Sequence, residues 1–233
     1  MKRLSLRLQA AFDFVPQGSY FADIGADHAY LTLALLEKGK IEWAQAVENK
    51  TGPFIRMKTN VDASPYASHV LCTQADGLDQ LSEDVDCIAL CGMGGKLAAD
   101  ILERGKSKLE RVSTLILDPH RDLSCVRKKA VELGYRVEDE KMVYEDKIYY
   151  SIILFRKGAS EKPYTNLELA LGPALLRKRD PVFLSFLADA QKKVGKILDK
   201  GLSETSRRKY LNLYRALKSI RGEGGSEERK SLT

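Results

Sequence analysis

The 233-residue sequence predicts an α/β protein, in which a doubly wound, mostly parallel sheet is followed by a smaller α-helical unit. The first observation is the segment 20–31, where an apolar run stops at Gly25 and apolar residues at helical spacing begin at Tyr30. A strand that ends at glycine and continues into a helix is the first half of a βαβ unit. The second observation is that strand-like and helix-like segments alternate up to residue 157. The third is that the remaining segments show helical spacing alone.

Seven strands and five helices are expected in the sheet domain. The helices are predicted at residues 4–15, from residue 30 onward, 53–61, 96–102 and 122–133. The strands are predicted at residues 20–24, 43–47, 70–73, 85–90, 115–117, 137–142 and 148–155. The last two strands are separated by a short polar turn, so we expect them to pair in antiparallel fashion and to complete the sheet by residue 157.

The rest of the chain predicts a linker and a helical hairpin. Residues 158–165 are polar and contain a proline, which is typical of a linker. Residues 181–198 carry an apolar seam, Gly201 interrupts it, and Ser203 is placed to cap a second helix that ends near residue 220. We therefore expect three parts, namely a sheet domain at residues 1–157, a basic helical appendage at residues 164–221 and a disordered tail at residues 222–233.

Composition excludes several classes of protein. A hydrophobic share of 44% with 30% charged residues is that of a globular domain in water. The longest apolar run is far shorter than the roughly 20 residues of a membrane span, and no signal-peptide pattern opens the sequence. The four cysteines form no C-x-x-C pair, which favours reduced thiols over zinc ligands or disulfides. We therefore expect a cytoplasmic protein with neither a metal site nor a membrane partner.

The net charge of +6 is unevenly distributed. Residues 1–157 carry 22 Lys and Arg against 23 Asp and Glu, whereas residues 158–233 carry 16 against 9. A nearly neutral body with a basic appendage indicates a polyanionic partner that the appendage binds. A solvated, lysine-rich helix is the alternative.

The end of the first strand predicts a ligand site. Gly25 would let the backbone approach a ligand closely, yet the G-x-G-x-x-G pattern of a dinucleotide site is absent. Asp23 and Asp27 flank this glycine, and two carboxylates would repel a pyrophosphate. They suit a ligand with positive charge, such as the sulfonium and amino groups of S-adenosylmethionine. A nucleotide-phosphate site is the alternative.

Two further strand ends carry acids. Glu48 lies 23 residues after Gly25, at the end of the second strand, where an acid can accept both ribose hydroxyls of a bound nucleoside. Asp76 follows the third strand and could accept from an adenine amino group, while Gly77 leaves room for the ring. An ordinary surface glutamate and a plain Asp-Gly turn are the respective alternatives.

The fourth and fifth strands end in residues that would face the same crevice. Three glycines within residues 92–95, Gly92 and Gly94 among them, indicate an unusual bend or a close ligand contact. Met93 lies in that loop and would touch the ligand or the acceptor. Asp118 and His120 follow the fifth strand at the same sheet edge. An exposed loop histidine without a role is the alternative for His120.

Taken together, these motifs resemble the bacterial tRNA adenine-N1 methyltransferases that modify adenosine 22 in the D-loop. The resemblance covers nearly the whole folded chain. It is carried by residues 23–31 (Asp-Ile-Gly-Ala-Asp-His-Ala-Tyr-Leu), 92–95 (Gly-Met-Gly-Gly) and 172–176 (Gly-Pro-Ala-Leu-Leu), and by the opening 4–8. The chain departs from the family pattern at Ala26, usually Ser, at Thr32, usually Pro, and at residues 118–120, where many members have Gln-Pro-Asn.

The resemblance implies a Rossmann-like, seven-stranded class I methyltransferase sheet with a C-terminal coiled-coil-like helical domain. It implies transfer of a methyl group from S-adenosylmethionine to N1 of adenosine 22 in tRNA. The alternatives are a methyltransferase for another RNA base or a small molecule, and a non-catalytic RNA-binding protein that retains the fold. The sequence leaves the oligomeric state open, with a monomer slightly favoured.

The chemistry predicts a site without an activated nucleophile, because N1 of adenine already has a nucleophilic lone pair at neutral pH. Catalysis is then mostly positioning, with carboxylates stabilising the charge that forms on an extruded base. The expected catalytic residues are Asp27 and Asp118. The resemblance implies that Asp23, Gly25, Asp27, His28, Glu48 and Asp76 belong to the cofactor site, and Gly77, Gly92 and Gly94 are expected to bind the cofactor with them. The expected tRNA-binding residues are Met93, His120, Lys2, Arg3, Arg7, Arg177, Lys178 and Arg179.

Overall fold

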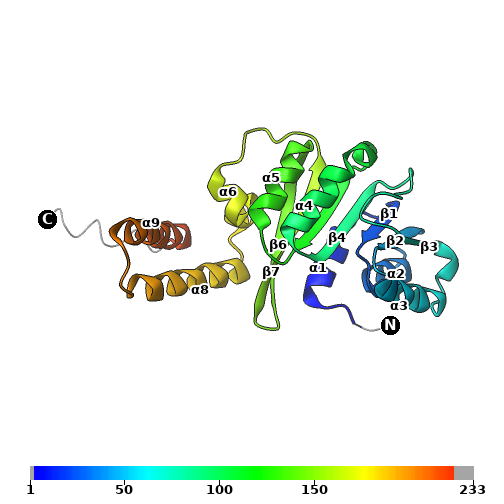
Figure 1. Cartoon of the computed structure of the whole chain (residues 1–233), viewed down its shortest axis with the longest axis horizontal. Coiled ribbons are helices and arrows are strands. Elements are labelled where there is room, and N and C mark those ends of the chain that lie inside the picture. The colour runs from blue at the N-terminus through cyan, green and yellow to red at the C-terminus, as the bar shows by residue number, and fades with distance from the viewer. Residues whose placement is uncertain (1–2, 223–233) are drawn as a thin grey trace. The chain divides into compact units, whose positions relative to one another are not determined.

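The computed structural model describes residues 3–222 of the chain (Figure 1). The chain divides into two compact units, residues 1–174 and residues 175–233. This division falls later than the linker expected at residues 158–165. The cause is a set of contacts between residues 166–174 and the sheet domain, described below.

Seven strands form a single sheet in the order β3-β2-β1-β4-β5-β7-β6. They are β1 (Phe21–Ile24), β2 (Ala44–Glu48), β3 (Val70–Gln74), β4 (Cys87–Met93), β5 (Thr114–Pro119), β6 (Tyr135–Glu145) and β7 (Ile148–Lys157). The first five strands are parallel, and β7 pairs in antiparallel fashion with both β5 and β6. The predicted seven-stranded sheet with an antiparallel last pair is therefore confirmed.

Helices cover both faces of the sheet, as a doubly wound fold requires. One face packs against α1 (Leu6–Phe14), α2 (Tyr30–Glu37) and α3 (Thr51–Asp62), and the other against α4 (Gly95–Arg104) and α5 (Leu123–Glu132). Two short 3₁₀ helices, Ala67–His69 and Lys106–Leu109, precede β3 and β5. Every residue of β1 is buried, because Phe21 enters one core and Ala22 and Ile24 the other. A strand covered on both faces explains the short apolar run in the sequence.

The order of the strands places a crevice beside β1. This strand pairs with β2 on one side and with β4 on the other, so the chain changes its winding direction there. In doubly wound sheets, ligands bind at such a switch point, outside the carboxyl ends of the strands. Gly25, which follows β1, lies at this position.

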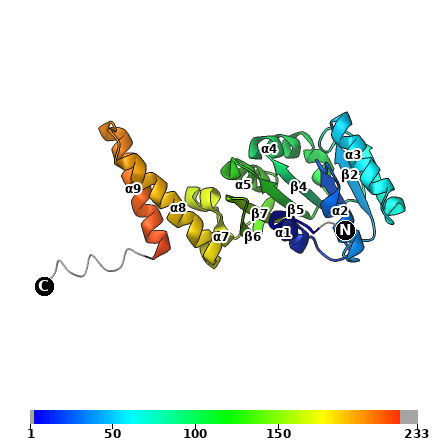
Figure 2. The same cartoon turned by 90° about the horizontal axis from the view of Figure 1, so that it is seen from below.

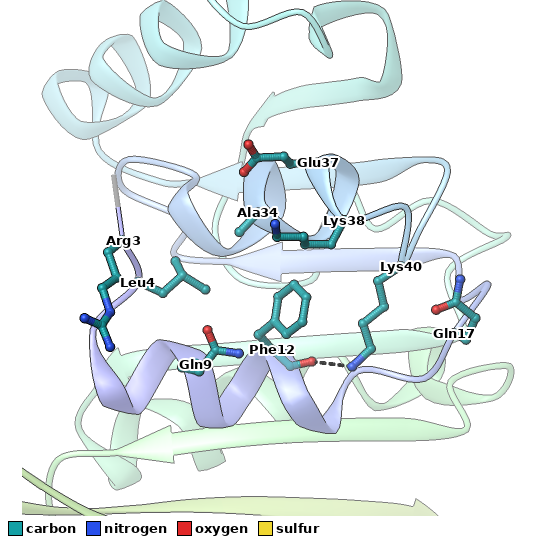
Figure 3. Close-up of a pocket in the computed structure, with 9 residues that line it drawn as sticks. All are labelled: Arg3, Leu4, Gln9, Phe12, Gln17, Ala34, Glu37, Lys38 and Lys40. Atoms are coloured by element: carbon teal, nitrogen blue, oxygen red, sulfur yellow. Dashed lines mark hydrogen bonds between the residues drawn. The ribbon is translucent and has the colours of Figure 1, made fainter. Parts of the chain in front are cut away.

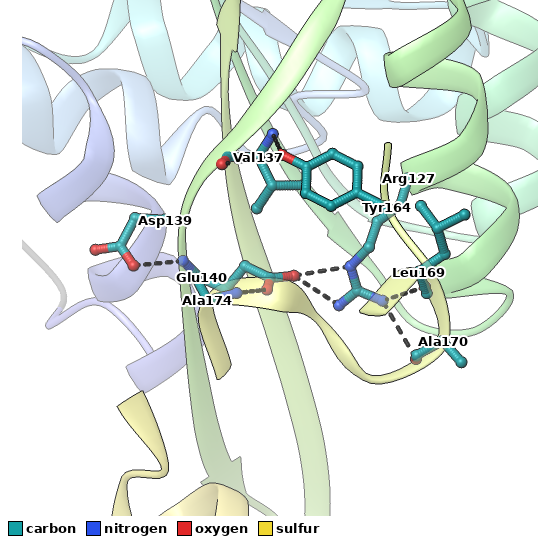
Figure 4. A network of polar contacts seen from close by, with 8 residues as sticks. All are labelled: Arg127, Val137, Asp139, Glu140, Tyr164, Leu169, Ala170 and Ala174. Atoms are coloured by element: carbon teal, nitrogen blue, oxygen red, sulfur yellow. Dashed lines mark hydrogen bonds and ion pairs between the residues drawn. The ribbon is translucent and has the colours of Figure 1, made fainter. Parts of the chain in front are cut away.

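A buried ion pair fixes α6 (Asn166–Leu171) to the sheet domain. Arg127 Nη2 in α5 lies 2.7 Å from Glu140 Oε1 in β6, with side chains only 1% and 0% exposed. Arg127 also donates to the carbonyls of Leu169 and Ala170, and Glu140 accepts from the N–H of Ala174 (Figure 4). The pair therefore satisfies backbone groups at the end of α6 and holds the segment that precedes the second unit.

The second unit is the expected helical hairpin. Helix α7 (Pro173–Lys178) spans the boundary, and α8 (Pro181–Leu198) and α9 (Glu204–Arg221) pack against each other (Figure 2). Ser203 caps α9 as predicted, since its hydroxyl accepts from the N–H of Ser206. Leu187 and Val194 of α8 and Leu217 of α9 are buried. Apart from Gly222, the predicted tail lies outside the described residues.

Within residues 3–222, none of the helices combines the length and apolarity that a membrane span requires.

We predict that Glu140→Gln destabilises the protein by about 3–5 kcal/mol, because it leaves the buried guanidinium of Arg127 without its counter-charge. The measurement is urea unfolding at pH 7. The matched control is Asp62→Asn, which breaks an exposed pair with Lys58 and is expected to cost far less, because exposed pairs are screened by solvent. Equal losses in the two variants would contradict the role of the buried pair.

Candidate active site

Two adjoining cavities occupy the crevice at the carboxyl ends of β1, β2 and β4. The larger has a volume of about 350 Å³ and extends toward Glu48 and Asp76. The smaller has a volume of about 270 Å³ and extends toward Arg7. Both are lined by Gly25, Asp27, Cys91 and Gly92. An elongated ligand could therefore extend from one cavity into the other past Gly25.

The backbone between these cavities adopts an uncommon conformation. Gly25, Asp27 and Ala29 have φ angles of 76°, 44° and 55°, in the left-handed region. Glycine adopts such angles freely and aspartate tolerates them, but alanine rarely does. The N–H groups of Gly25 and Ala26 both donate to the Val47 carbonyl at the end of β2, at 2.8 and 3.0 Å. The turn is thereby fixed to the neighbouring strand.

Asp23 is a buried carboxylate beneath this turn. Its side chain accepts a hydrogen bond from the Thr32 hydroxyl at 2.9 Å, and only 5% of the residue is exposed. Burial raises the pKa of Asp23 to about 6, with Glu48 adding to the effect and Thr32 opposing it. Thr32 occupies the position at which the sequence departs from the family proline, so this departure has a structural consequence at the site.

Asp27 lies where the two cavities meet and is half-exposed. Its Oδ1 is 3.1 Å from Arg56 Nη2, and its Oδ2 is 3.7 Å from His28 Nε2. The His28 ring stacks on Tyr30 with centroids 5.1 Å apart, and Asn60 lies within hydrogen-bonding distance of His28 Nδ1. The structure thus places Asp27 and His28 together. It adds Arg56 and Asn60, which no sequence motif marks.

Glu48, Asp76 and Gly77 all line the larger cavity. Glu48 is 8% exposed, and its Oε1 accepts from the N–H groups that follow it, at 3.1 and 3.2 Å. Asp76 is half-exposed and accepts from Arg104 at 2.8 Å, which lowers the pKa of Asp76. Gly77 has a φ of 57°, and a Cβ there would lie 2.9 Å from Ile101 Cγ2. A side chain at that position would have a strained backbone and would displace Ile101.

A different physical constraint applies at each of the three glycines that follow Leu90. Gly92 has a φ of 78° and lies at a bulge in β4, which continues to Met93 instead of ending at residue 90. Gly94 caps α4 in an extended conformation and lines neither cavity. At Gly95 a Cβ would lie 2.5 Å from the Arg121 carbonyl oxygen, so close packing excludes a side chain. The Met93 methyl group lies against Gly25, 3.2 Å from where a Cβ would be, and Met93 lines the larger cavity.

Asp118 lies within β5 and is fully buried. It accepts from Arg7 Nη1 at 2.7 Å, and burial raises the pKa of Asp118 in spite of this pairing. Arg7 projects from α1 into the smaller cavity, a quarter exposed. The sequence groups Arg7 with Lys2 and Arg3 as residues expected to bind tRNA, but α1 packs with the Arg7 side chain over Asp118 in β5.

Arg7, His120 and Tyr150 gather over Gly92. The His120 ring meets the Tyr150 ring edge-on at 5.5 Å, and the Arg7 guanidinium lies 5.8 Å from the Tyr150 centroid. A Cβ at Gly92 would lie 3.5 Å from Arg7 Nη1 and 3.9 Å from His120 Nε2. Tyr150 is absent from the predicted site, because it lies inside a strand and no motif marks it.

The remaining residues expected to bind tRNA lie elsewhere. Lys2 is outside the described residues. Arg3 lines a cavity of about 590 Å³ between α1 and α2, where Lys40 also donates to the Phe12 carbonyl (Figure 3). Three consecutive basic residues at the start of the second unit are exposed: Arg177, Lys178 and Arg179.

Among residues 3–222, no group of three or more His, Cys, Asp or Glu side chains is arranged to hold a metal ion, and all four cysteines are free thiols.

We predict that Asp23→Asn stabilises the protein in a pH-dependent way. The folded protein retains the Asp23 proton up to about pH 6, whereas the unfolded chain loses it near pH 3.9, so the stability of the wild type falls between these values and is level above them. The variant should match the wild type near pH 4 and exceed it by about 2–3 kcal/mol at pH 7.5.

The measurement is urea unfolding at four pH values without ligand. Thr32→Val is the companion variant: loss of the hydroxyl donor should raise the pKa of Asp23 further and enlarge the pH-dependent difference. A difference between Asp23→Asn and wild type that does not change with pH would contradict the assignment.

Comparison with known proteins identifies the family. The family model described as tRNA (adenine(22)-N(1))-methyltransferase matches residues 21–222. The tRNA (adenine(22)-N(1))-methyltransferase of Bacillus subtilis is 36% identical over 187 residues, which cover 78% of this chain and 79% of that protein.

Comparison with solved structures supports the same family. A Streptococcus pneumoniae protein described as a candidate tRNA (m1A22) methyltransferase superposes with a TM-score of 0.89 and 30% identity, over 94% of this chain and 100% of the other. Its complex with S-adenosyl-L-methionine gives a TM-score of 0.86 at 30% identity over the same shares of the two chains. The chain therefore belongs to the tRNA (adenine(22)-N(1))-methyltransferase family.

Proposed function

We propose that this protein transfers the methyl group of S-adenosylmethionine to N1 of adenosine 22 in tRNA. The observation that carries the proposal is the pair of cavities that meet at Gly25, with carboxylates on both sides of that glycine. Membership of the family, and the complex of the S. pneumoniae relative with S-adenosyl-L-methionine, support the same activity.

The residues of the two cavities fit the two ends of this cofactor. In the larger cavity, Glu48 accepts from the ribose hydroxyls, and Asp76 accepts from the adenine amino group beside Gly77. The Glu48 side chain accepts from the backbone through Oε1, so Oε2 can accept from a ligand. An acid at the end of the second strand commonly binds the ribose in such sheets, as proposed for Glu48.

The smaller cavity suits a zwitterion. It is lined by two acids, Asp23 and Asp27, and by one cation, Arg7. The acids match an ammonium group, and the Arg7 guanidinium matches a carboxylate. We therefore assign Arg7 to the amino-acid end of the cofactor instead of to the tRNA backbone. Asp118, fully buried beneath Arg7, positions that guanidinium and does not touch the base.

The charges in the site account for catalysis. The cofactor supplies a methyl group on a positively charged sulfur, and the product base carries the positive charge after transfer. Asp27 lines both cavities, so its carboxylate faces the region through which this charge moves. A fixed carboxylate there stabilises positive charge during the transfer. No side chain has to remove a proton, because N1 of adenine carries none.

The second unit supplies cations for the RNA backbone. Residues 175–222 carry 13 Lys and Arg against 4 Asp and Glu. Arg177, Lys178 and Arg179 are all exposed at its beginning. Cations of this density bind phosphates and release counterions.

We predict that the wild type incorporates labelled methyl groups into unmodified tRNA and that nucleoside mapping finds them at N1 of adenosine 22. Glu48→Gln should weaken binding of S-adenosylmethionine about 10-fold, and Asp27→Asn should lower kcat about 100-fold through loss of transition-state stabilisation. Asp62→Asn, at an exposed ion pair on α3, is the control and should leave both constants unchanged.

Methyl groups at another position or on a small molecule would favour a different acceptor. Failure to bind S-adenosylmethionine in calorimetry would favour a non-catalytic RNA-binding protein.

We predict that replacing Arg177, Lys178 and Arg179 together by Gln reduces the salt dependence of tRNA binding. The slope of log K against log [salt] should fall by about 0.7–0.9 for each phosphate that the variant no longer neutralises. Binding of S-adenosylmethionine should not change. The control replaces Lys106 and Lys108 by Gln in the 3₁₀ helix before β5. An unchanged slope in the triple variant would exclude these residues from tRNA binding.

A further inference from the structure

The hairpin of β6 and β7 extends well past the rest of the sheet. Strand β7 pairs with β5 only from Ile153 to Arg156, but it pairs with β6 as far as Ile148 and Glu145. Residues 148–152 therefore continue beyond the last β5 pair, over about 15 Å at the usual rise per residue. We call residues 141–152 the arm. Figure 1 shows the β6–β7 hairpin projecting beyond the neighbouring strands. It projects from the carboxyl edge of the parallel strands, where residues that line the two cavities also lie.

The arm is held rigidly. Asp146 and Lys147 have φ angles of 49° and 65°, as in the two-residue turns that match the twist of paired strands. Helix α1 lies along one face, where Val143 and Ile152 enter the same core as the helix. The Leu6 N–H donates to Glu145 Oε1 at 2.6 Å at the tip. A segment braced in this way loses little conformational freedom when something binds to it.

Large apolar side chains remain exposed at the tip. Tyr144 is 47% exposed and Ile148 is 51% exposed, and Leu6 on the adjoining end of α1 is 51% exposed. The Tyr149 ring lies against the Tyr144 ring with centroids 4.5 Å apart and a tilt of 40°. Tyr149 therefore supports one side of the Tyr144 ring and leaves much of that ring open to solvent.

On the face that α1 covers, the arm reaches Arg7 of the smaller cavity and His120, which is expected to contact the tRNA. Tyr150, one residue beyond Tyr149, contacts both His120 and Arg7. In the strand register Val143 pairs with Tyr150, and Tyr144 pairs with Tyr149. Tyr144 thus lies one residue pair farther out than the contact with His120, and its side chain is on the opposite face of the hairpin from α1 and Tyr150.

We propose that Tyr144, supported by Tyr149, forms a stacking surface for an unpaired base of the tRNA next to the extruded adenosine. The proposal rests on the function proposed above. Extrusion of a base from folded RNA leaves its neighbours without a stacking partner. Aromatic rings accept any base in this way, and a tyrosine with two rotatable bonds does so at a low cost in entropy. Binding by stacking also needs no charge, which suits a site rich in carboxylates.

The test compares Tyr144→Ala with Tyr144→Phe in the full chain, using unmodified tRNA and saturating S-adenosylmethionine. Tyr144→Ala should lower kcat/KM for tRNA by about 5- to 150-fold, the range for loss of one base–aromatic stack, and mainly by raising KM. Tyr144→Phe should remain within twofold of wild type. Tyr20→Ala is the matched control, because Tyr20 is 53% exposed at the amino end of β1.

A second experiment locates the stacked base. A set of tRNAs with single abasic positions in the D-loop is assayed with wild type and Tyr144→Ala. The effect of Tyr144→Ala should disappear for one abasic tRNA, while the salt slope of binding and the Kd of S-adenosylmethionine stay unchanged.

Three results would overturn the proposal. The first is activity of Tyr144→Ala equal to that of wild type, and the second is an equal loss in Tyr144→Phe, which would indicate a role for the hydroxyl. The third is sedimentation showing that wild type dimerises and Tyr144→Ala does not, which would identify the tip as a contact between copies. A wild type that fails to methylate adenosine 22 would instead overturn the proposed function.

Discussion

The site depends on the left-handed backbone between Gly25 and Ala29. Placing Asp27 and Ala29 at positive φ costs roughly 1–2 kcal/mol per residue, and the Val47 carbonyl offsets part of this by accepting two hydrogen bonds. The result is that Asp23 and Asp27 lie on either side of a bare glycine backbone. Ala29 also leaves the start of α2 without a side-chain cap, and the Asp23 carboxylate accepts a backbone hydrogen bond from Thr32 in that first turn. Strain here serves to shape the crevice.

The buried carboxylates of the site also favour a cationic ligand, because their ionised forms are unfavourable without one. Burial raises the pKa of both Asp23 and Asp118, so each ionised carboxylate is less stable in the ligand-free protein than in water. The guanidinium of Arg7 compensates Asp118, whereas the donors to Asp23 are neutral groups, the hydroxyl and the backbone N–H of Thr32. A ligand ammonium group in the smaller cavity would stabilise the ionised form of Asp23. Carboxylates perturbed in this way are typical of functional sites and not of sites selected for stability.

Local sequence signals predicted the fold, and they marked several of the acids and glycines that line the two cavities. The strand–glycine–helix junction and the spacing from Gly25 to Glu48 are encoded by neighbouring residues, so they could be recognised without a structure. Contacts between residues far apart in the sequence could not be recognised in this way. Arg7 lies over Asp118 because of how α1 packs, Gly95 is required by the Arg121 carbonyl, and the pairing of Arg127 with Glu140 moves the unit boundary past residue 158. Strands β4 and β5 also run farther than predicted, since Gly92 continues β4 through a bulge and Pro119 still belongs to β5.

The cofactor and the tRNA place opposite requirements on the charge of the protein, and the distribution of charge along the chain meets both. A cleft that stabilises a sulfonium and a cationic base must be acidic, and an acidic cleft repels the phosphates of RNA. The free energy for holding tRNA therefore has to come from residues outside the cleft. The chain concentrates its excess cations in residues 175–222, and within the sheet domain it offers the uncharged Tyr144 ring at the tip of a rigid arm. Under the function proposed above, these cations bind the RNA backbone without weakening the carboxylates that stabilise the transferred charge.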